Sequence, residues 1–197
     1  TGFKWIADQI HQYETGKADH TFMFGFEESY GYLIKPFVRD KDAIQSLTLL
    51  AEVAAYYRSR DMTLYDGLQE LFKKYGYFRE KTIANTYAGV DGPAKIQNLM
   101  KKFREEAPAD FAGHKVAVTE DFSKGTKTTA DGQASELGIP ESNVLRYVLD
   151  DETWIAIRPS GTEPKLKFYI GTSADSLDKA NAKLADFEKA LQAFAEE

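Results

Sequence analysis

Three consecutive segments near the C-terminus alternate apolar and polar residues, and this pattern constrains the fold more than any other feature of the sequence. They read VLRYVL, WIAIRP and KLKFYIG, and the first two are separated by the acidic triplet Asp150-Asp151-Glu152. Alternation with a period of two places the apolar side chains on one face of a strand. The pattern therefore predicts a hairpin followed by a further strand, all with one buried face.

The rest of the second half adds strands and helices to this sheet. Strand-like runs occupy residues 77–89 and 114–122, and a helix is predicted to begin at Asp91-Gly92-Pro93, because proline is favoured in a first helical turn. The last helix repeats apolar residues at near-helical spacing from Leu177 to Phe194. Residues 123–143 are polar and rich in turn formers, so we expect a mobile connection there. Several strands covered by two helices indicate an α+β domain from about residue 78 to the end.

The first part of the chain is mostly helical. Helices are predicted over residues 3–14, 43–57 and 64–75; the second is apolar on more than one face and should be central to its domain. Thr63 and Asp66 form a capping-box pattern before the third helix, whose buried stripe should include Leu68 and Leu71. The only good strand is TFMFGF, residues 21–26. One strand cannot make a sheet, and the chain does not begin with methionine, so we expect it to start partway through a longer protein.

The composition excludes several classes of protein. The 197 residues carry a net charge of −6 with a pI near 5.2, which argues against a general nucleic-acid or anionic-membrane surface. The chain has no cysteine, which excludes disulfides and thiolate metal sites and fits a reducing cytosol. No run approaches the ~20 apolar residues of a membrane helix. We therefore expect a cytoplasmic protein that binds neither nucleic acid nor membrane.

The loop in WIAIRPSGTEPKLKFYIG carries more chemistry than a hairpin turn requires. Arg158 offers a planar fork of donors that matches two phosphate oxygens, and Ser160 and Thr162 supply hydroxyls. Gly161 lets backbone amides approach an anion closely. The following strand adds positive charge at the residues Lys165 and Lys167. These residue types indicate a phosphate pocket, with an ordinary surface hairpin as the alternative.

A second loop, in FGFEESYGY, follows the predicted strand of the first part. Its residues Glu27 and Ser29 can hydrogen-bond the vicinal hydroxyls of a sugar. A solvated acidic turn and a metal site are the alternatives, and no histidine or Asp-x-Asp pattern completes an oxygen cage for a metal. We expect no metal site in this chain: the histidines lack partner spacing, and Asp150-Asp151-Glu152 is interpreted as a solvated turn.

The two loops, in this order and joined by a helix-rich segment, resemble the alpha-D-phosphohexomutase family. The similarity extends over TGFKWI, FGFEESYGYLI, VRDKDA, MTLYDGLQELFKKYGYFREK and IRPSGTEPKLKFYIG, and within the family it is greatest to the bacterial alpha-phosphoglucomutases. It implies that residues 1–77 are the later part of an α/β domain three. Residues 78–197 would be domain four, an α+β domain with an antiparallel sheet covered by helices, similar to the TATA-binding-protein fold.

The resemblance also implies residue roles. Glu27 and Ser29 match the sugar contacts of the family, and Arg158, Ser160, Gly161 and Thr162 match its phosphate loop. Lys4 matches a lysine near the transferring phosphoryl group. Lys165 and Lys167 are added as further phosphate contacts because of their charge and proximity. The nucleophilic serine and the magnesium loop of the family match no stretch of this chain, so Mg²⁺ is expected in the parent protein and not in this fragment.

The expected parent interconverts glucose 1-phosphate and glucose 6-phosphate through a phosphoserine and glucose 1,6-bisphosphate, whereas the fragment alone should be inactive. A phosphomannomutase or phosphopentomutase is the alternative within the family. A sugar-phosphate binding module without catalysis and a structural interaction domain without a ligand are the alternatives outside it. If strands are missing before TFMFGF, its exposed edge should favour self-association.

Overall fold

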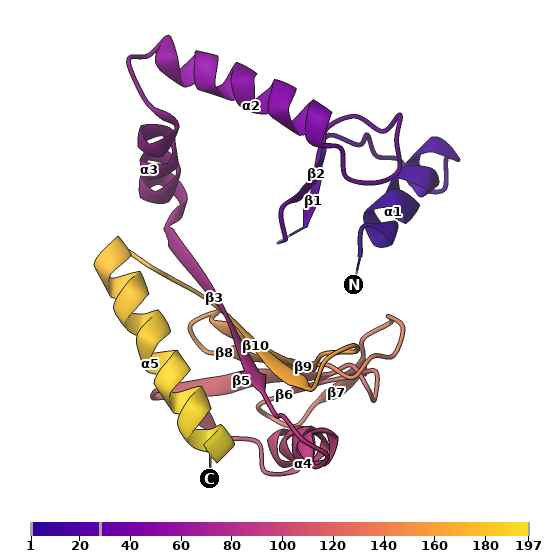
Figure 1. Ribbon diagram of the computed structural model, residues 1–197, viewed down its shortest axis with the longest axis vertical. Helices are drawn as coiled ribbons and strands as arrows, with labels where there is room; N and C mark the ends of the chain where they lie inside the picture. The colour runs from indigo at the N-terminus through magenta and orange to yellow at the C-terminus, as the bar shows by residue number, and fades with distance from the viewer. Residues whose placement is uncertain (1, 28, 197) are drawn as a thin grey trace. The chain divides into compact units, whose positions relative to one another are not determined.

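The computed structural model describes residues 2–27 and 29–196, and the chain divides into two compact units. Unit 1 ends at Leu71 and unit 2 begins at Phe72, so the division falls within helix α3 (Leu64–Tyr75) (Figure 1). The domain boundary expected between residues 77 and 78 stays a prediction about the domains of the family.

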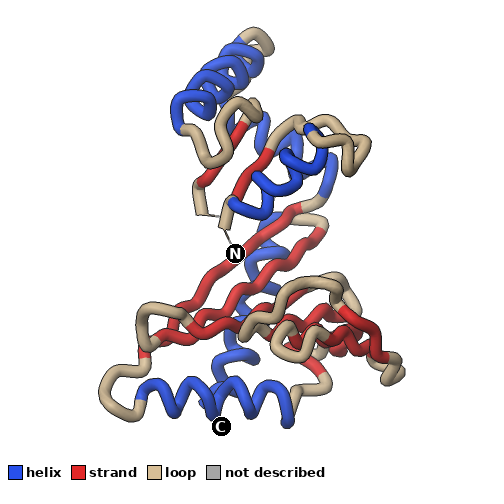
Figure 2. Tube along the Cα trace, turned by 90° about the vertical axis from the view of Figure 1, so that its right-hand side faces the viewer, coloured by secondary structure: helices blue, strands red, loops and turns tan. Residues whose placement is uncertain are grey.

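Unit 1 is built on a short β-hairpin with helices on either side of it in sequence. Helix α1 (Lys4–Glu14) is followed by strands β1 (Gly25–Glu27) and β2 (Gly31–Leu33), which pair antiparallel, and then by α2 (Ala43–Arg58) (Figure 2). Its fully buried core is small and comprises Phe3, Ile10 and Leu33. The sequence predicts only one strand here, and this is wrong: the left-handed backbone at Tyr30 (φ 62°) turns the chain so that GYL pairs back onto GFE.

Helix α2 begins where expected but is not buried. The carboxylate of Asp42 accepts hydrogen bonds from the amides of Ile44 (2.8 Å) and Gln45 (3.1 Å), which satisfies two of the free N–H groups at the start of the helix. None of its residues is buried, and the side chains of Ile44 and Leu47 are 79% and 66% exposed. The expectation that this helix is central to its domain is therefore not met among the described residues.

Helix α3 shows the predicted capping box. The amide of Thr63 donates to Asp66 Oδ2 (2.8 Å) and the amide of Asp66 donates to Thr63 Oγ1 (3.2 Å). The helix ends at Tyr75, and the next residue, Gly76, takes the left-handed φ of 106° that favours glycine. The expected buried stripe is wrong for this structure, because Leu68 is 43% exposed and Leu71 47% exposed.

Unit 2 is an antiparallel sheet with helices on one face. The strands are β3 (Tyr77–Thr86), β4 (Asp110–Phe111), β5 (His114–Asp121), β6 (Thr126–Thr129), β7 (Ala134–Glu136), β8 (Leu145–Leu149), β9 (Trp154–Pro159) and β10 (Lys165–Ala174). Their order is β3-β10-β9-β8-β5-β6-β7, and β4 pairs with β5. The hairpin and further strand predicted from the alternating segments are β8, β9 and β10, and they form the centre of the sheet.

The alternation places the apolar residues of these central strands in one core. They pack against helices α4 (Gly92–Glu105) and α5 (Leu177–Glu196), which contribute Met100, Phe103, Phe187 and Leu191 among others. The opposite face of the central strands carries the alternate residues, which include Arg146, Ala156, Arg158 and Lys167. The core thus fixes which side chains the sheet presents on the face away from α4 and α5.

Two features of unit 2 differ from the expectations. The segment 123–143, expected to be a mobile connection, contains β6 and β7, because the threonine-rich run Thr126–Thr129 pairs with β5. The acidic triplet is not simply a solvated turn, since the Asp151 side chain is 19% exposed and contacts both Lys183 (2.5 Å) and His114 (3.1 Å). Among the described residues, no helix is long and apolar enough to span a lipid bilayer.

Candidate functional site

The predicted phosphate loop connects two central strands of unit 2. It runs from the end of β9 to the start of β10, and the amide of Ser160 donates to the carbonyl oxygen of Lys165 (2.8 Å), which closes it. The carbonyl oxygen of Pro164 also accepts a hydrogen bond from the amide of Tyr87 (2.8 Å). The base of the loop is therefore held by backbone hydrogen bonds, independently of its functional side chains.

Arg158 and Lys167 are directly paired across β9 and β10 and share the face of the sheet away from α4 and α5. Among the residues that the structure describes, neither has a hydrogen bond or an ion pair to a carboxylate. Lys165, by contrast, forms an ion pair with Glu163 (Nζ to Oε2, 3.0 Å). Two adjacent cations without internal partners favour an anion, whereas the charge of Lys165 is already balanced.

The tip of the loop borders a cavity of about 380 Å³ within unit 2, on the α4 side of the sheet, and neither Arg158 nor Lys167 lines it. Ser160, Gly161 and Thr162 line it, and in the described part of the chain neither hydroxyl donates to another protein group. A Cβ atom added at Gly161 would meet nothing within 4 Å, so packing does not require glycine at this position. The open space lets a ligand approach the backbone at Gly161, whereas the Ser160 amide is already used in the hydrogen bond to Lys165.

The other wall of this cavity contains residues that the sequence analysis did not identify. Helix α4 contributes Pro93, Ile96, Gln97 and Met100, and Asn143 reaches the cavity from the segment before β8. No pattern in the sequence links these residues to the loop, because they lie far from it along the chain. Together they add apolar surface and two amide groups to the hydroxyls of the loop.

Glu27 and Ser29 come together at the hairpin of unit 1. Ser29 Oγ lies 3.5 Å from Glu27 Oε2, and Lys41 Nζ lies 3.5 Å from Glu27 Oε1. Lys41 also contacts Asp40 (2.8 Å), and this hydrogen bond, with the charge of Glu27, raises the pKa of Lys41. Lys41 is a residue that the sequence analysis missed, although it lies in the VRDKDA stretch quoted for the family resemblance.

The path of the Lys41 side chain explains a glycine of the hairpin. A Cβ atom added at Gly31 would collide with the methylene groups of Lys41, so a larger residue would displace the lysine from Glu27. Gly31 therefore permits a carboxylate, a hydroxyl and an ammonium to gather at one end of the hairpin. Such a set can donate to and accept from the hydroxyls of a polyol.

Lys4 is the first residue of α1, and its Nζ lies 5.3 Å from the ring centroid of Trp5. Lys4 is exposed, and in the described residues it has no ion-pair partner. The structure therefore leaves its ammonium available, and the role implied by the family resemblance stays a prediction.

Among the described residues, one group could hold a metal ion: His114, Asp150 and Asp151 offer ligand atoms within 4.8 Å of one another. The ammonium of Lys183 contacts Asp151 and provides the positive charge that a metal would supply. Mg²⁺ prefers oxygen ligands in octahedral geometry, which an imidazole and a lysine-bound carboxylate do not provide. These residues do not fit magnesium, and we interpret them as a clamp between β5, the β8–β9 turn and α5.

Comparison with known proteins gives two family matches. Residues 1–75 match the phosphoglucomutase/phosphomannomutase alpha/beta/alpha domain III, and residues 93–191 match the C-terminal domain of the same family. The chain belongs to the phosphoglucomutase/phosphomannomutase family. The expected fold class, part of an α/β domain followed by an α+β domain, is confirmed with this assignment.

Similar members of the family are phosphoglucomutases of Staphylococcus. The protein from Staphylococcus epidermidis is 42% identical over 187 residues, which are 94% of this chain and 34% of the relative. The protein from Staphylococcus aureus (strain USA300) is 40% identical, and the match covers 93% of this chain and 33% of that protein. The protein from Staphylococcus haemolyticus is 37% identical, and the match covers 94% of this chain and 33% of that protein. The chain thus spans about a third of the length of these curated relatives.

Proposed function

We propose that this chain is the sugar- and phosphate-binding part of a phosphoglucomutase that interconverts glucose 1-phosphate and glucose 6-phosphate. The observation that carries the proposal is the pair Arg158 and Lys167, whose charges lack internal partners among the described residues, beside a loop with two available hydroxyls. The family assignment and the similarity to the staphylococcal phosphoglucomutases support it.

The loop is suited to hold the phosphate that is not reacting. Phosphoryl transfer depends on positioning and on stabilisation of charge, so a bisphosphate intermediate needs a distant clamp for its idle end. The Arg158 guanidinium can donate two parallel hydrogen bonds to one phosphate group. Lys167 adds a second charge from the neighbouring strand, and Ser160 and Thr162 can donate from their hydroxyls.

Glu27 and Ser29 are proposed to contact the sugar ring. A bisphosphate must turn end for end between the two transfers, and the vicinal hydroxyls in the middle of the ring exchange places when it turns. A carboxylate that accepts beside a hydroxyl that donates or accepts can serve both orientations. We add Lys41 to this group, because it lies beside Glu27 and can donate to a ring oxygen.

A titration of this chain tests the phosphate loop. Inorganic phosphate and glucose 6-phosphate are added to the wild-type chain and to Arg158→Ala, while NMR follows the backbone amide shifts of residues 160–162. We expect weak binding, on the order of millimolar, because a loop without the rest of its cleft is poorly preorganised. Arg79→Ala is the matched control, since Arg79 pairs with Thr172 of β10 beyond the loop. Equal affinity of wild type and Arg158→Ala would refute the proposal.

The activity of the whole protein needs a separate experiment. We expect the 197-residue chain to show no mutase turnover with glucose 1,6-bisphosphate present, since the serine nucleophile expected in the family matches no stretch of it. Turnover above background would refute this expectation. Comparing full-length rates on glucose, mannose and pentose phosphates separates phosphoglucomutase from phosphomannomutase and phosphopentomutase. A full-length protein without turnover on any of them would favour a non-catalytic sugar-phosphate binding module.

Three further properties follow from the proposal for the parent protein: a phosphoserine intermediate, dependence on Mg²⁺ held by another domain, and a location in the cytoplasm, where hexose phosphates are metabolised. When bound, Mg²⁺ would stabilise the charge of the transferring phosphoryl group. The residues of this chain would bind and orient the substrate and would not ligate the ion.

A further inference from the structure

We infer that Tyr169 is a further ligand-binding residue of the phosphate site, and that the short side chain of Ala156 lets the phosphate group approach the sheet beside it. This inference rests on the proposed function of Arg158 and Lys167 and extends their site along the same face of the sheet. It follows from the register of β9 and β10, in which Lys167 pairs with Arg158 and Tyr169 pairs with Ala156.

The first step is the face of the sheet on which Tyr169 lies. Its neighbours in sequence, Phe168 and Ile170, are 1% and 0% exposed and belong to the core under α4 and α5. Because side chains alternate along a strand, Tyr169 stands on the opposite face. Ala156 is its direct partner on β9, and paired residues of antiparallel strands share a face. Both residues therefore lie on the face that carries the two cations.

The second step is the distance between Tyr169 and the cations. Tyr169 is two residues from Lys167 on β10, which separates their Cα atoms by about 6.8 Å. It is also the diagonal neighbour of Arg158 on β9, at about 7–8 Å. Aromatic and long side chains reach one another over such a diagonal. The three side chains can therefore contact one phosphate group together.

The third step is the availability of the donors. In the part of the chain that the structure describes, the hydroxyl of Tyr169 has no hydrogen-bond partner, and neither has the side chain of Arg158 or Lys167. Arg146 lies on the same face, but it donates to Glu120 Oε2 over 2.9 Å. Its charge is thus already balanced, and the donors without partners gather around Tyr169.

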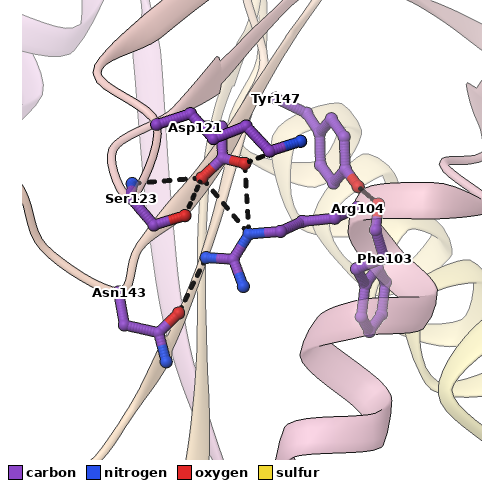
Figure 3. Close-up of polar contacts among 7 residues, drawn as sticks. Phe103, Arg104, Asp121, Ser123, Asn143 and Tyr147 are labelled. Carbon is purple, nitrogen blue, oxygen red and sulfur yellow. Dashed lines mark hydrogen bonds and ion pairs between the residues drawn. The ribbon is translucent and has the colours of Figure 1, made fainter.

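The remaining arginines of unit 2 confirm that such a lack of partners is particular to Arg158. On the other face, Arg104 Nε lies 3.2 Å from both carboxylate oxygens of Asp121, and its Nη2 donates to Asn143 Oδ1 over 2.7 Å (Figure 3). Arg79 Nε donates to Asn181 Oδ1 over 2.8 Å. Among the arginines of unit 2, therefore, three are held by described residues and one is left for a ligand.

The fourth step is the room that Ala156 leaves. In the next row of the sheet, the indole of Trp154 covers Gly171, because a Cβ atom added at Gly171 would lie 2.4 Å from the indole ring. Ala156 has only a methyl group, so the sheet stays open to a ligand at its position. Two cations balance the charge of a phosphate monoester, and the Tyr169 hydroxyl can donate to one of its oxygens without adding charge. The ligand class is a phosphate ester.

Three variants test this inference on the 197-residue chain, with the phosphate and glucose 6-phosphate titrations described above. Tyr169→Phe removes only the hydroxyl and should weaken binding about threefold to tenfold. Ala156→Ile fills the open position without changing any charge, and should weaken binding at least about tenfold. Ser135→Ile is the matched control. It adds similar bulk on the same face at the edge strand β7, and should change affinity by no more than about twofold.

Two measurements make the test independent of folding defects. In the wild-type chain, the amide shifts of residues 156 and 169 should change with the same Kd as those of residues 160–162. Urea unfolding without phosphate shows whether each variant folds, and Tyr169→Phe carries the test if Ala156→Ile does not fold. A merely structural role of Tyr169 would lower the urea midpoint of Tyr169→Phe and leave its affinity for phosphate unchanged.

The outcomes separate this inference from the proposed function. If Arg158→Ala abolishes binding while Tyr169→Phe binds as tightly as wild type, the role of Tyr169 is wrong and the loop remains a phosphate site. If Ala156→Ile binds as tightly as wild type, or if the amides of residues 156 and 169 do not respond, the ligand does not approach the sheet at Ala156. If wild type and Arg158→Ala bind equally or not at all, the proposed function fails, and the inference fails with it.

Discussion

Replacing Asp121 by asparagine should destabilise unit 2, because the substitution leaves the mostly buried Arg104 without its carboxylate partner. The substitution keeps an oxygen that can accept from Ser123 but removes the negative charge beside Arg104, whose side chain is 16% exposed. Removing one partner of a buried ion pair costs about 3–5 kcal/mol. Since Arg104 keeps Asn143 and some contact with solvent, we expect a loss of about 2–3 kcal/mol.

The dependence of this loss on pH identifies its cause. Burial raises the pKa of Asp121, but the hydrogen bonds of Ser123 and the charge of Arg104 outweigh it and hold the pKa below the ordinary 3.8. A lowered pKa in the folded state stabilises the fold above pH 3.8, and this stabilisation disappears as the pH falls through the folded pKa. The difference between wild type and Asp121→Asn should therefore be complete at about pH 7 and shrink in acid.

Urea unfolding with tryptophan fluorescence measures the effect on unit 2. The two tryptophans are Trp5 and Trp154, so a Trp5→Phe background leaves a probe on β9 only. With an m-value of about 1–2 kcal/mol per molar urea, the midpoint should fall by about 1–3 M. Asp175→Asn is the control: its pair with Lys179 is 71% and 69% exposed and should contribute little. An unchanged midpoint for Asp121→Asn, or a loss that persists in acid, would refute the reasoning.

Further predictions concern a buried hydroxyl, two glycines and self-association. Tyr147→Phe removes the buried hydroxyl that donates to the carbonyl oxygen of Phe103 near the end of α4, and should cost about 1–2 kcal/mol in urea unfolding. Gly92→Ala places a Cβ atom against the carbonyl oxygen of Tyr87 and should cost about 1–3 kcal/mol, whereas Gly161→Ala, with open space around it, should leave the midpoint unchanged. The exposed apolar side chains of α2 and the outer edges of the β1–β2 hairpin, which pair with no other described strand, should cause concentration-dependent self-association. Light scattering that shows a monomer at all concentrations would contradict this.

What the sequence could predict depends on whether the information is local. The alternation in the segments of β8, β9 and β10 is a local pattern, and it correctly assigns Leu166 and Phe168 to the buried face. The capping box before α3 is likewise complete within four residues. Burial of α2 depends on what packs against it, so the apolar residues predicted a helix correctly but not its exposure.

The contacts of the candidate sites are mostly not local, and for that reason they were missed. Lys41 and Glu27 are 14 residues apart, and Arg104 and Asn143 are 39 apart. The loop tip itself was recognisable because its chemistry lies in one short stretch. Its opposite wall was not, because α4 and the segment before β8 reach the cavity only after the sheet has formed around the core.

The same alternation that builds the core also imposes a cost at the site. Burying Ile157 and Leu166 forces Arg158 and Lys167 to the other face, where they stand directly opposite each other as like charges. Such a pair destabilises neighbouring strands by a fraction of about 1 kcal/mol. Arg158→Ala should therefore leave unit 2 as stable as wild type, or slightly more stable, in the absence of phosphate.

Bound phosphate should make the wild-type protein more stable than Arg158→Ala. A ligand that binds only the folded state at ten times its Kd stabilises it by about 1.4 kcal/mol, which corresponds to a urea midpoint shift of about 1 M. Wild type should show this shift in phosphate, and Arg158→Ala should not, with sodium chloride at matched ionic strength as the control. Equal stabilisation of both proteins by phosphate would mean that the paired cations are an incidental result of the strand register and not a binding site.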